Sequence, residues 1–314
     1  MAKVKVVPGT KRNALEQLVD DFLASARARG LSPRTVEGAY AFILKSVFLA
    51  FCDRAGISQP EQLSNRVMDR LSTELQSSPG KRGELLSKHT IAAYMRTINI
   101  FLKWAAGEGE AVKAKGQVPK VPKRLVEILS REEIRKFEDA AKGERDKLII
   151  RVLADTGIRV GELTGLRTSD LVMQNRDRYL HVRGKGARDR MVPIKPELFM
   201  RLSRFAERGR PLEARGDRIF IGLRRRRYGD FEPLTESGVH QVVDALRITA
   251  GIEKRVYPHL FRHSYGTFML SQGMNPILLA QIMGHSSLAM IQNVYAHLSP
   301  SDAYEAMLRA LQDS

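Results

Sequence analysis

The sequence of 314 residues contains a single cysteine, Cys52, which excludes a disulfide within the chain and any zinc site built from cysteines. Cys52 follows an apolar stretch, residues 48–51, and this setting favours a small buried core residue over a reactive thiol. A chain without disulfides suits a reducing compartment. We therefore expect the protein in the cytoplasm.

Long apolar runs are also missing. No stretch reaches the roughly 18 consecutive apolar residues that predict a membrane-spanning helix. The first eight residues lack the apolar core of a signal peptide. The sequence therefore predicts a soluble protein with no membrane partner.

Acidic residues are scarce relative to basic ones. The chain has 35 Asp and Glu against 52 Lys and Arg, which gives a formal net charge of +17. Such an excess creates a positive field that attracts polyanions, with nucleic acid as the first candidate and a membrane surface as the second. An ordinary basic soluble protein is the third reading. With 43% apolar residues, the length fits about two domains of roughly 100–200 residues.

The first part of the chain has helical periodicity. Apolar residues recur at three- and four-residue steps, and Ser32 with Pro33 is typical of a helix start. Four helices are predicted: one around residues 15–23, one from Ser32-Pro33 to Gly56, one over about 64–77, and one from Ser87 to about 106. Short connections between them favour a compact bundle, which we assign to residues 1–112.

Residues 107–124 interrupt this pattern. The segment is rich in Gly, Pro and Lys and poor in bulky apolar residues, which is typical of an extended basic linker. We place the linker at residues 113–124 and a second domain at 125–314.

The second domain is predicted to mix helices with a small β region. Two strand-like runs, 179–183 and 190–194, flank a turn-rich tip and predict a β-hairpin. Helices are expected at about 130–141, 144–156, 159–165, 195–207, 235–249, 258–272, 275–283, 287–294 and 300–312. The fold class is therefore mainly α with a small β-sheet: a helical bundle followed by an α+β domain.

Polar residues interrupt the apolar patterns of the second domain at four places. Arg159 and Glu162 are three positions apart on a predicted helix, and an ordinary surface ion pair is the alternative reading. Lys185 lies between two glycines at the hairpin tip, where a mobile cation can reach a DNA groove. Apart from these four places, the run Arg224 to Arg227 is the densest charge block, and it is either a solvated loop or a grip on a phosphate backbone.

The other two places lie nearer the C-terminus. His259 and Arg262 share a helix face just after Pro258, at a predicted helix start that favours an anion. The alternative is a core histidine beside a surface arginine. His285 follows a glycine, and Tyr295 stands ten residues further on, where a lone tyrosine is usually a core or interface residue.

Taken in order, these residues resemble the catalytic set of the tyrosine site-specific recombinases, the family of phage-type integrases and Xer-type recombinases. The resemblance covers most of the chain. Residues 32–36 and 87–91 match the helical core-binding domain, and the second domain matches the catalytic domain. The step of ten residues from His285 to Tyr295 departs from the nine that are common in the family, and we expect a longer turn before the tyrosine helix.

The resemblance implies that Tyr295 attacks a DNA phosphorus, forms a 3′-phosphotyrosine and expels a 5′ oxygen. Guanidinium groups bind phosphate oxygens in a fork, which suits Arg159 and Arg262 to the charge of the transition state. By resemblance, Lys185 protonates the leaving oxygen, His259 assists proton transfer at the nucleophile, and His285 hydrogen-bonds the phosphate. We expect neither metal nor other cofactor, and no need for ATP.

Partners follow from the same resemblance. They are double-stranded DNA recombination sites, with two protomers on each site and four in a synaptic complex. Whether an accessory recombinase or a DNA-bending factor is also needed stays open. Arg34, Lys88 and Arg96 lie in the helices that are expected to face DNA, with ordinary solvated faces as the alternative. A type IB topoisomerase and a non-catalytic DNA-binding protein are the competing functions.

Overall fold

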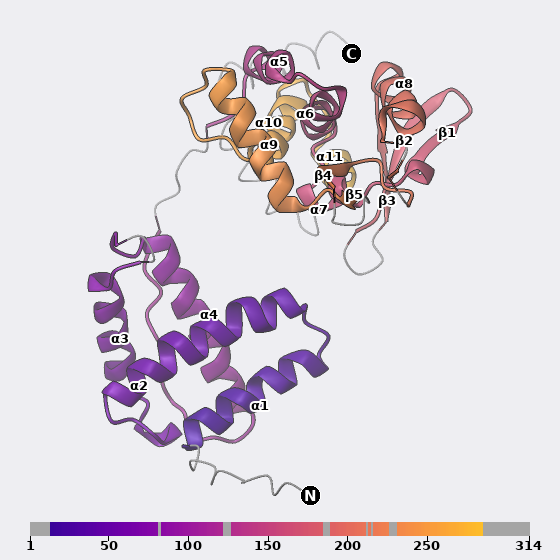
Figure 1. Cartoon of the computed structure of the whole chain (residues 1–314). Helices are drawn as coiled ribbons and strands as arrows, with labels where there is room; N and C mark the ends of the chain where they lie inside the picture. Colours follow the sequence, from indigo (N-terminus) through magenta and orange to yellow (C-terminus); the bar gives the residue numbers. More distant parts are fainter. Residues whose placement is uncertain are drawn as a thin grey trace, which may run out of the picture. The chain divides into compact units, whose positions relative to one another are not determined.

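The computed structural model describes residues 13–80, 83–121, 127–184, 189–211, 213–214, 216–225 and 231–284. Contacts divide the chain into two compact units, Met1–Arg124 and Leu125–Ser314. Both are drawn in Figure 1 and each is described by itself below. The first is helical and the second combines helices with small antiparallel sheets, which confirms the predicted fold class.

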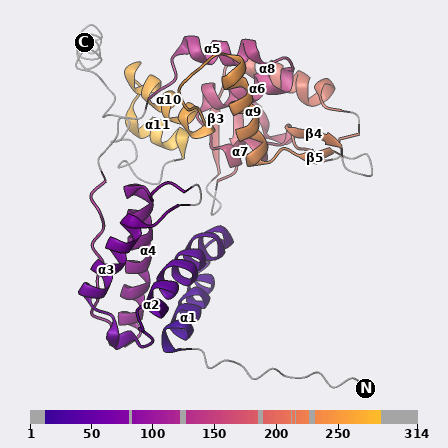
Figure 2. The same ribbon diagram turned by 60° about the vertical axis from the view of Figure 1, so that its left-hand side comes forward.

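The first unit is a helical bundle. Side chains of Asn13, Ser64 and Ser87 cap three of its helices by accepting hydrogen bonds from backbone N–H groups of the first turn. Its elements are α1 (Ala14–Ala28), η1 (Arg34–Tyr40), η2 (Phe42–Leu49), α2 (Ala50–Arg54), η3 (Pro60–Gln62), α3 (Asn65–Ser77) and α4 (Lys88–Gly107). In both Figure 1 and Figure 2, α1 and α4 lie close together.

The predicted second helix is one helical stretch, but η1 and η2 have the wider hydrogen-bonding of a π-helix. Periodicity in the sequence does not distinguish this geometry from an α-helix. The stretch Arg34–Arg54, with a mean hydropathy of 1.5, is long and apolar enough to cross a membrane by length and composition. Ile43, Leu44 and Phe48 on one face of this stretch pack into the bundle core, and 33% of its most apolar part is buried in the structure.

Aromatic rings fill the centre of this core. Phe22 and Phe101 are fully buried, with ring centroids 5.6 Å apart at 74°, and Phe48 meets Phe101 at 5.7 Å. Trp104 lies against Phe22 at 5.4 Å. Edge-to-face pairs of this kind add to the apolar burial, so that α1, η2 and α4 are held by one aromatic cluster.

Part of the predicted linker packs on the bundle. Val112 and Ala114 are buried in the core of the first unit. Asn99 on α4 donates through Nδ2 to the Gly116 carbonyl (2.9 Å) and accepts from its N–H (2.8 Å). Residues 113–116 of the predicted linker thus dock on the bundle without regular secondary structure, and the linker bounds of 113–124 stay a prediction.

The second unit is built around α6 and α10. The sequence explains two helix starts: Ser130 and Glu133 form a capping box, and Pro258 occupies the first turn of α10. Its helices are α5 (Arg131–Ala140), α6 (Glu144–Thr156), α7 (Val160–Gly165), η4 (Thr168–Asp170), α8 (Pro196–Arg204), η5 (Phe205–Gly209), α9 (Glu236–Thr249), α10 (Pro258–Ser271) and α11 (Pro276–Met283).

A three-stranded antiparallel sheet runs in the order β1-β2-β3, from β1 (Leu171–Gln174), β2 (Asp177–Val182) and β3 (Arg190–Pro193). The β2–β3 pair is the predicted hairpin, with Leu180 opposite Val192. Three short strands were not predicted: β1, β4 (Ile221–Arg225) and β5 (Phe231–Pro233). The helices expected at 287–294 and 300–312 lie outside the described residues.

The core of the second unit positions the site. α6 is buried along most of its length and packs against α5, α8 and α10. The Phe137 and Phe261 rings join α5 to α10 at 5.4 Å. α6 ends at Gly157, which has a left-handed backbone (φ 60°), and the chain then turns directly into α7. This turn and the first turns of α7 and α10 line the same cleft.

Candidate active site

The second unit contains a cleft of about 730 Å3 that is lined by residues from α7, β3, α9, α10 and the end of α11. Three of the six predicted catalytic residues line it: Arg159, His259 and Arg262. Lys185, His285 and Tyr295 lie outside the described residues. The residues that directly precede two of them in sequence, Gly184 and Gly284, do line the cleft.

Arg159 caps the start of α7 and projects into the cleft. Its Nη1 donates to Oε1 of Glu162 (3.0 Å) and its Nη2 donates to the carbonyl oxygen of Gly284 (2.9 Å). The Arg159 side chain keeps 43% of its surface exposed, whereas that of Glu162 keeps 8%. The pair is therefore not an ordinary surface ion pair, since its acidic member is buried.

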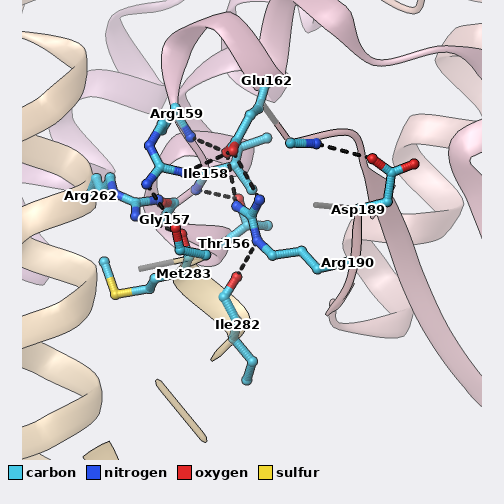
Figure 3. Close-up of polar contacts among 12 residues, drawn as sticks. Thr156, Gly157, Ile158, Arg159, Glu162, Asp189, Arg190, Arg262, Ile282 and Met283 are labelled. Carbon is cyan, nitrogen blue, oxygen red and sulfur yellow. Dashed lines mark hydrogen bonds and ion pairs between the residues drawn. The ribbon is translucent and has the colours of Figure 1, made fainter. Parts of the chain in front are cut away.

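Arg190 on β3 is the second partner of Glu162. Its Nη1 and Nη2 donate to Oε1 and Oε2 at 2.9 and 2.8 Å, and its side chain is 9% exposed. Figure 3 shows the guanidinium groups of Arg159 and Arg190 turned toward the same carboxylate. Burial acts to raise the pKa of Glu162, but the hydrogen bonds from Arg190 and from the Arg159 N–H outweigh it and lower this pKa.

Arg262 is almost fully buried, with 2% of its surface exposed. Nη1 donates to the Gly157 carbonyl and Nη2 to the Met283 carbonyl, both at 2.6 Å. Burial, together with the positive charge of Arg159, lowers the pKa of Arg262 to about 10. The group stays charged at neutral pH, and three of its five N–H donors are not used in these two bonds.

His259 lies in the first turn of α10 and is exposed. The alternative of a core histidine beside a surface arginine is therefore wrong: the arginine is buried and the histidine is open. Partial desolvation lowers the pKa of His259, and the charges of Arg262 and Arg159 add to this effect. At neutral pH the imidazole is predominantly neutral and can accept a proton.

Sequence reasoning did not single out Arg190. The sequence pattern could have indicated it. Val192 and Ile194 follow Arg190 at every second position, so that all three share one face of the extended chain, and both are buried. An arginine on the inward face of a strand needs a buried partner. Arg183 and Glu236 also line the cleft without having been predicted, and Arg183 pairs with Asp170 at 2.6 Å.

The predicted DNA-contacting residues of the first unit are on its surface. Arg34 begins η1, Lys88 begins α4, and Arg96 lies on α4; all three are exposed. Their exposure permits a contact with DNA, and the contact itself stays a prediction.

Within the described part of the chain, no group of three or more His, Cys, Asp or Glu side chains is placed to hold a metal ion. Tyr265 on α10 packs against Gly157, which precedes the cleft residue Ile158, and is 5% exposed. Burial and the nearby Asp155 raise the pKa of Tyr265 to about 12. A phenol that is buried and hard to ionise is poorly suited to be a nucleophile.

Two arginines and a histidine thus converge on one cleft, beside the first turn of α10. This arrangement defines an anion-binding site of the kind that phosphoryl-transfer enzymes use to stabilise charge. The phage integrase family model matches residues 127–302, which include the whole cleft. The chain belongs to the phage integrase family, and the resemblance inferred from the sequence is confirmed.

Curated relatives carry names from the same group. Tyrosine recombinase XerA of Pyrococcus horikoshii is 31% identical over 220 residues, which is 69% of this chain and 72% of the relative. Tyrosine recombinase XerD of Bifidobacterium longum is 26% identical over 316 residues, 94% of this chain and 97% of the relative.

Solved structures agree on the fold. The crystal structure of XerA recombinase covers 94% of this chain and 98% of its own, with 26% identity and a TM-score of 0.51. The Tn1549 transposon integrase in complex with a circular intermediate DNA has a TM-score of 0.71 at 20% identity, covering 95% of this chain and 99% of its own. At that identity the likeness concerns the fold alone. The topoisomerase alternative is not favoured, since the family is that of the phage integrases and the curated relatives are named tyrosine recombinases.

Proposed function

We propose that this chain is a site-specific DNA recombinase that cleaves and rejoins DNA strands with Tyr295 as the nucleophile. The observation that supports this most directly is the convergence of Arg159, Arg262 and His259 on one cleft in a member of the phage integrase family. The ligand is double-stranded DNA, which suits the net charge of +17.

In the proposed first step, the phenolic oxygen of Tyr295 attacks the scissile phosphorus. A P–O bond to the tyrosine forms, the bond to the 5′ oxygen breaks, and a 3′-phosphotyrosine results. A free phenol titrates near pH 10, so that about a thousandth is ionised at neutral pH. The proton must therefore leave as the bond forms, and the neutral imidazole of His259 assists that transfer.

Negative charge gathers on the non-bridging oxygens in the transition state. Arg159 and Arg262, which both line the cleft, offer guanidinium donors to these oxygens. Lys185 gives a proton to the leaving 5′ oxygen, and His285 hydrogen-bonds the phosphate. Attack by a 5′-hydroxyl on the phosphotyrosine reverses the step on a second strand, so the phosphodiester energy is conserved and ATP is not needed.

Charge neutralisation by side chains replaces the metal ions that many nucleases use, so we propose that cleavage needs none. Two protomers occupy each DNA site and four form the synapse, with a partner recombinase or DNA-bending factor as a possible addition. Arg34, Lys88 and Arg96 contact the DNA backbone, and the protein works in the cytoplasm.

Covalent trapping tests this function. The full chain is incubated with nicked duplexes tiled across the genomic DNA that flanks its coding sequence. The DNA that stays attached after denaturation is sequenced. We expect adducts at one short site with wild type, in excess EDTA and without ATP, and none with Tyr295→Phe.

Three results would contradict the proposal. The first is the absence of wild-type adducts on a duplex that the Tyr295→Phe variant binds with equal affinity. The second is an adduct that persists in Tyr295→Phe. The third is a strict Mg²⁺ requirement, which would remove the metal-free mechanism. Relaxation of supercoiled plasmids that lack the site would favour a topoisomerase.

A further inference from the structure

Three consecutive carbonyl groups at the end of α11 accept hydrogen bonds from three different arginines, as Figure 3 shows for two of them. The last carbonyls of a helix lack partners within the helix, and the helix dipole makes this end negative, so that cations are favoured there. The pairs are Arg190 Nε with Ile282 (2.6 Å), Arg262 Nη2 with Met283 (2.6 Å) and Arg159 Nη2 with Gly284 (2.9 Å).

Arg190 differs from the other two arginines in its surroundings. Each of its three nitrogens donates to a protein atom: Nε to the Ile282 carbonyl, and Nη1 and Nη2 to the Glu162 carboxylate. Its side chain is 9% exposed, whereas that of Arg159 is 43% exposed. Arg190 therefore acts within the protein, and Arg159 remains open to a ligand in the cleft.

The carboxylate of Glu162 is the point where these two arginines are coupled. Oε1 accepts from Nη1 of Arg159 (3.0 Å) and Nη1 of Arg190 (2.9 Å). Oε2 accepts from the backbone N–H of Arg159 (2.7 Å) and Nη2 of Arg190 (2.8 Å). If Arg190 were absent, the buried negative charge of Glu162 would be balanced by Arg159 alone.

Gly284 gives a second, independent indication that Arg190 has a fixed place. A β-carbon on Gly284 would lie 2.9 Å from Nη1, 3.0 Å from Cζ and 3.1 Å from Nε of Arg190. Gly284 also has a left-handed backbone, with φ 65°. The guanidinium of Arg190 thus occupies the space beside the turn that ends α11, immediately before His285 in the sequence.

We propose that Arg190 is a positioning residue of the cleft. It balances the negative charge of Glu162 and anchors the end of α11, so that Glu162 does not offset the positive charge of Arg159, which stays available for the phosphate. This role rests on the proposed function, since it assumes that the cleft binds a phosphate group. Arg190 itself does not touch the phosphate.

The test uses inorganic phosphate and the full-length chain, so that it does not depend on knowing the DNA site. Phosphate is titrated into wild type while the guanidinium Nε–H signals of Arg159 and Arg262 are followed by NMR. We expect both signals to move in wild type. Arg190→Met should weaken phosphate binding at least roughly tenfold, which is about 1.4 kcal/mol.

The double variant Arg190→Met/Glu162→Gln separates charge balance from folding. Without the negative charge of Glu162, the charge of Arg159 is no longer offset, and we expect phosphate affinity to recover to within about threefold of wild type. A merely structural defect would be as severe or worse in the double variant. Arg190→Lys keeps the charge but loses the fork, and it should fall between wild type and Arg190→Met; it also serves if Arg190→Met does not fold.

Arg201→Met is the matched control. Arg201 also pairs with two carboxylates, at 2.7 and 2.9 Å, but it lies on α8 and does not line the cleft. It should bind phosphate like wild type. The role of Arg190 is overturned if Arg190→Met binds phosphate like wild type, or if the double variant shows no recovery. If wild type binds no phosphate, then the anion site and the role of Arg190 are both overturned. If wild type binds phosphate but forms no DNA adduct, then only the recombinase function is contradicted.

Discussion

Gly157 and Tyr265 are in direct contact, and the ring of Tyr265 fills the space that a side chain at position 157 would need. A β-carbon there would lie 3.0 Å from Cγ and 3.2 Å from Cε1 of the ring, and closer still to Cδ1. The backbone of Gly157 is left-handed, with φ 60°, and its carbonyl accepts from Arg262. The end of α6 is therefore tied to the cleft through this one residue.

Gly157→Ala should destabilise the second unit for two separate reasons. The left-handed backbone costs an alanine about 1–2 kcal/mol, and the collision with Tyr265 adds about 1–3 kcal/mol as overpacking. Chemical denaturation of the full chain measures the sum. Gly251→Ala is the matched control, because Gly251 has a similar φ of 65° with no heavy atom within 4 Å of its β-carbon position. Equal losses in both variants would contradict the contact with Tyr265.

Helices with strong apolar stripes and clear caps were predictable from the sequence. α4 begins after Ser87 and α10 begins at Pro258, as the sequence indicates. The short strands β1 and β4 were not, because four or five residues carry too little alternation to be distinguished from a loop. Their pairing is decided by partners elsewhere in the chain.

The site was predictable in its members but not in their environment. Spacing placed Arg159 with Glu162 and His259 with Arg262, but it did not show that Glu162 and Arg262 are the buried members. Burial depends on how α7 and α10 meet the end of α11, which local sequence does not encode. Arg190 escaped prediction for the same reason, since its partner Glu162 is 28 positions away.

Arg262→Lys should be more destabilising than Arg159→Lys. A lysine at 262 keeps a charge, but it cannot reach the carbonyls of both Gly157 and Met283, and a buried carbonyl left without a donor costs about 1–3 kcal/mol. Arg159→Lys should cost less, because position 159 is more exposed and the Glu162 carboxylate keeps Arg190 as a partner. Denaturation midpoints of the two variants measure this difference, and a loss for Arg159→Lys that equals that of Arg262→Lys would contradict it.

The pKa of His259 should lie below its ordinary value of about 6.5 and should rise in Arg159→Met, because one of the nearby positive charges is then gone. NMR titration of the full chain measures both values. Arg201→Met, which removes an arginine outside the cleft, should leave the pKa of His259 where it is in wild type. A lower pKa in Arg159→Met would contradict the electrostatic cause.

The free energy of unfolding should also depend on the protonation of His259. Because the folded-state pKa of His259 is lowered, its contribution is fully present above the unfolded pKa of about 6.5 and is lost as the pH falls through the folded value. His259→Gln should therefore flatten the decline of stability below about pH 6.5. Denaturant midpoints at a series of pH values check this, and a variant with an undiminished slope would speak against it.

Lys185→Ala tests the proposed general acid. Without a proton donor, the 5′ oxygen is a poor leaving group, and we expect cleavage to slow by about 10²–10⁴-fold. A 5′-thiol leaving group needs no proton and should restore the rate to near that of wild type. The measurement uses the DNA site mapped by covalent trapping, with Arg159→Lys on the same thiol substrate as a control that should not be rescued. Equal slowing of Lys185→Ala on both substrates would remove the general-acid role.

Asn99→Ala tests how the segment after α4 is held. The change removes both hydrogen bonds to the main chain of Gly116, and the free energy of unfolding should fall by about 1–3 kcal/mol. Trypsin should then cut first after Lys113 and Lys115, because the segment detaches while the bundle core persists.

Mass spectrometry of the earliest fragments distinguishes local release from global unfolding, since unfolding would spread the cuts over the whole unit. Gln17→Ala is the control, because it removes only a surface hydrogen bond to Asp21 on α1. If Asn99→Ala resists trypsin at Lys113 and Lys115 as well as Gln17→Ala does, then the buried Val112 and Ala114 and the hydrogen bond from Lys115 N–H to Asn65, rather than Asn99, keep the segment in place.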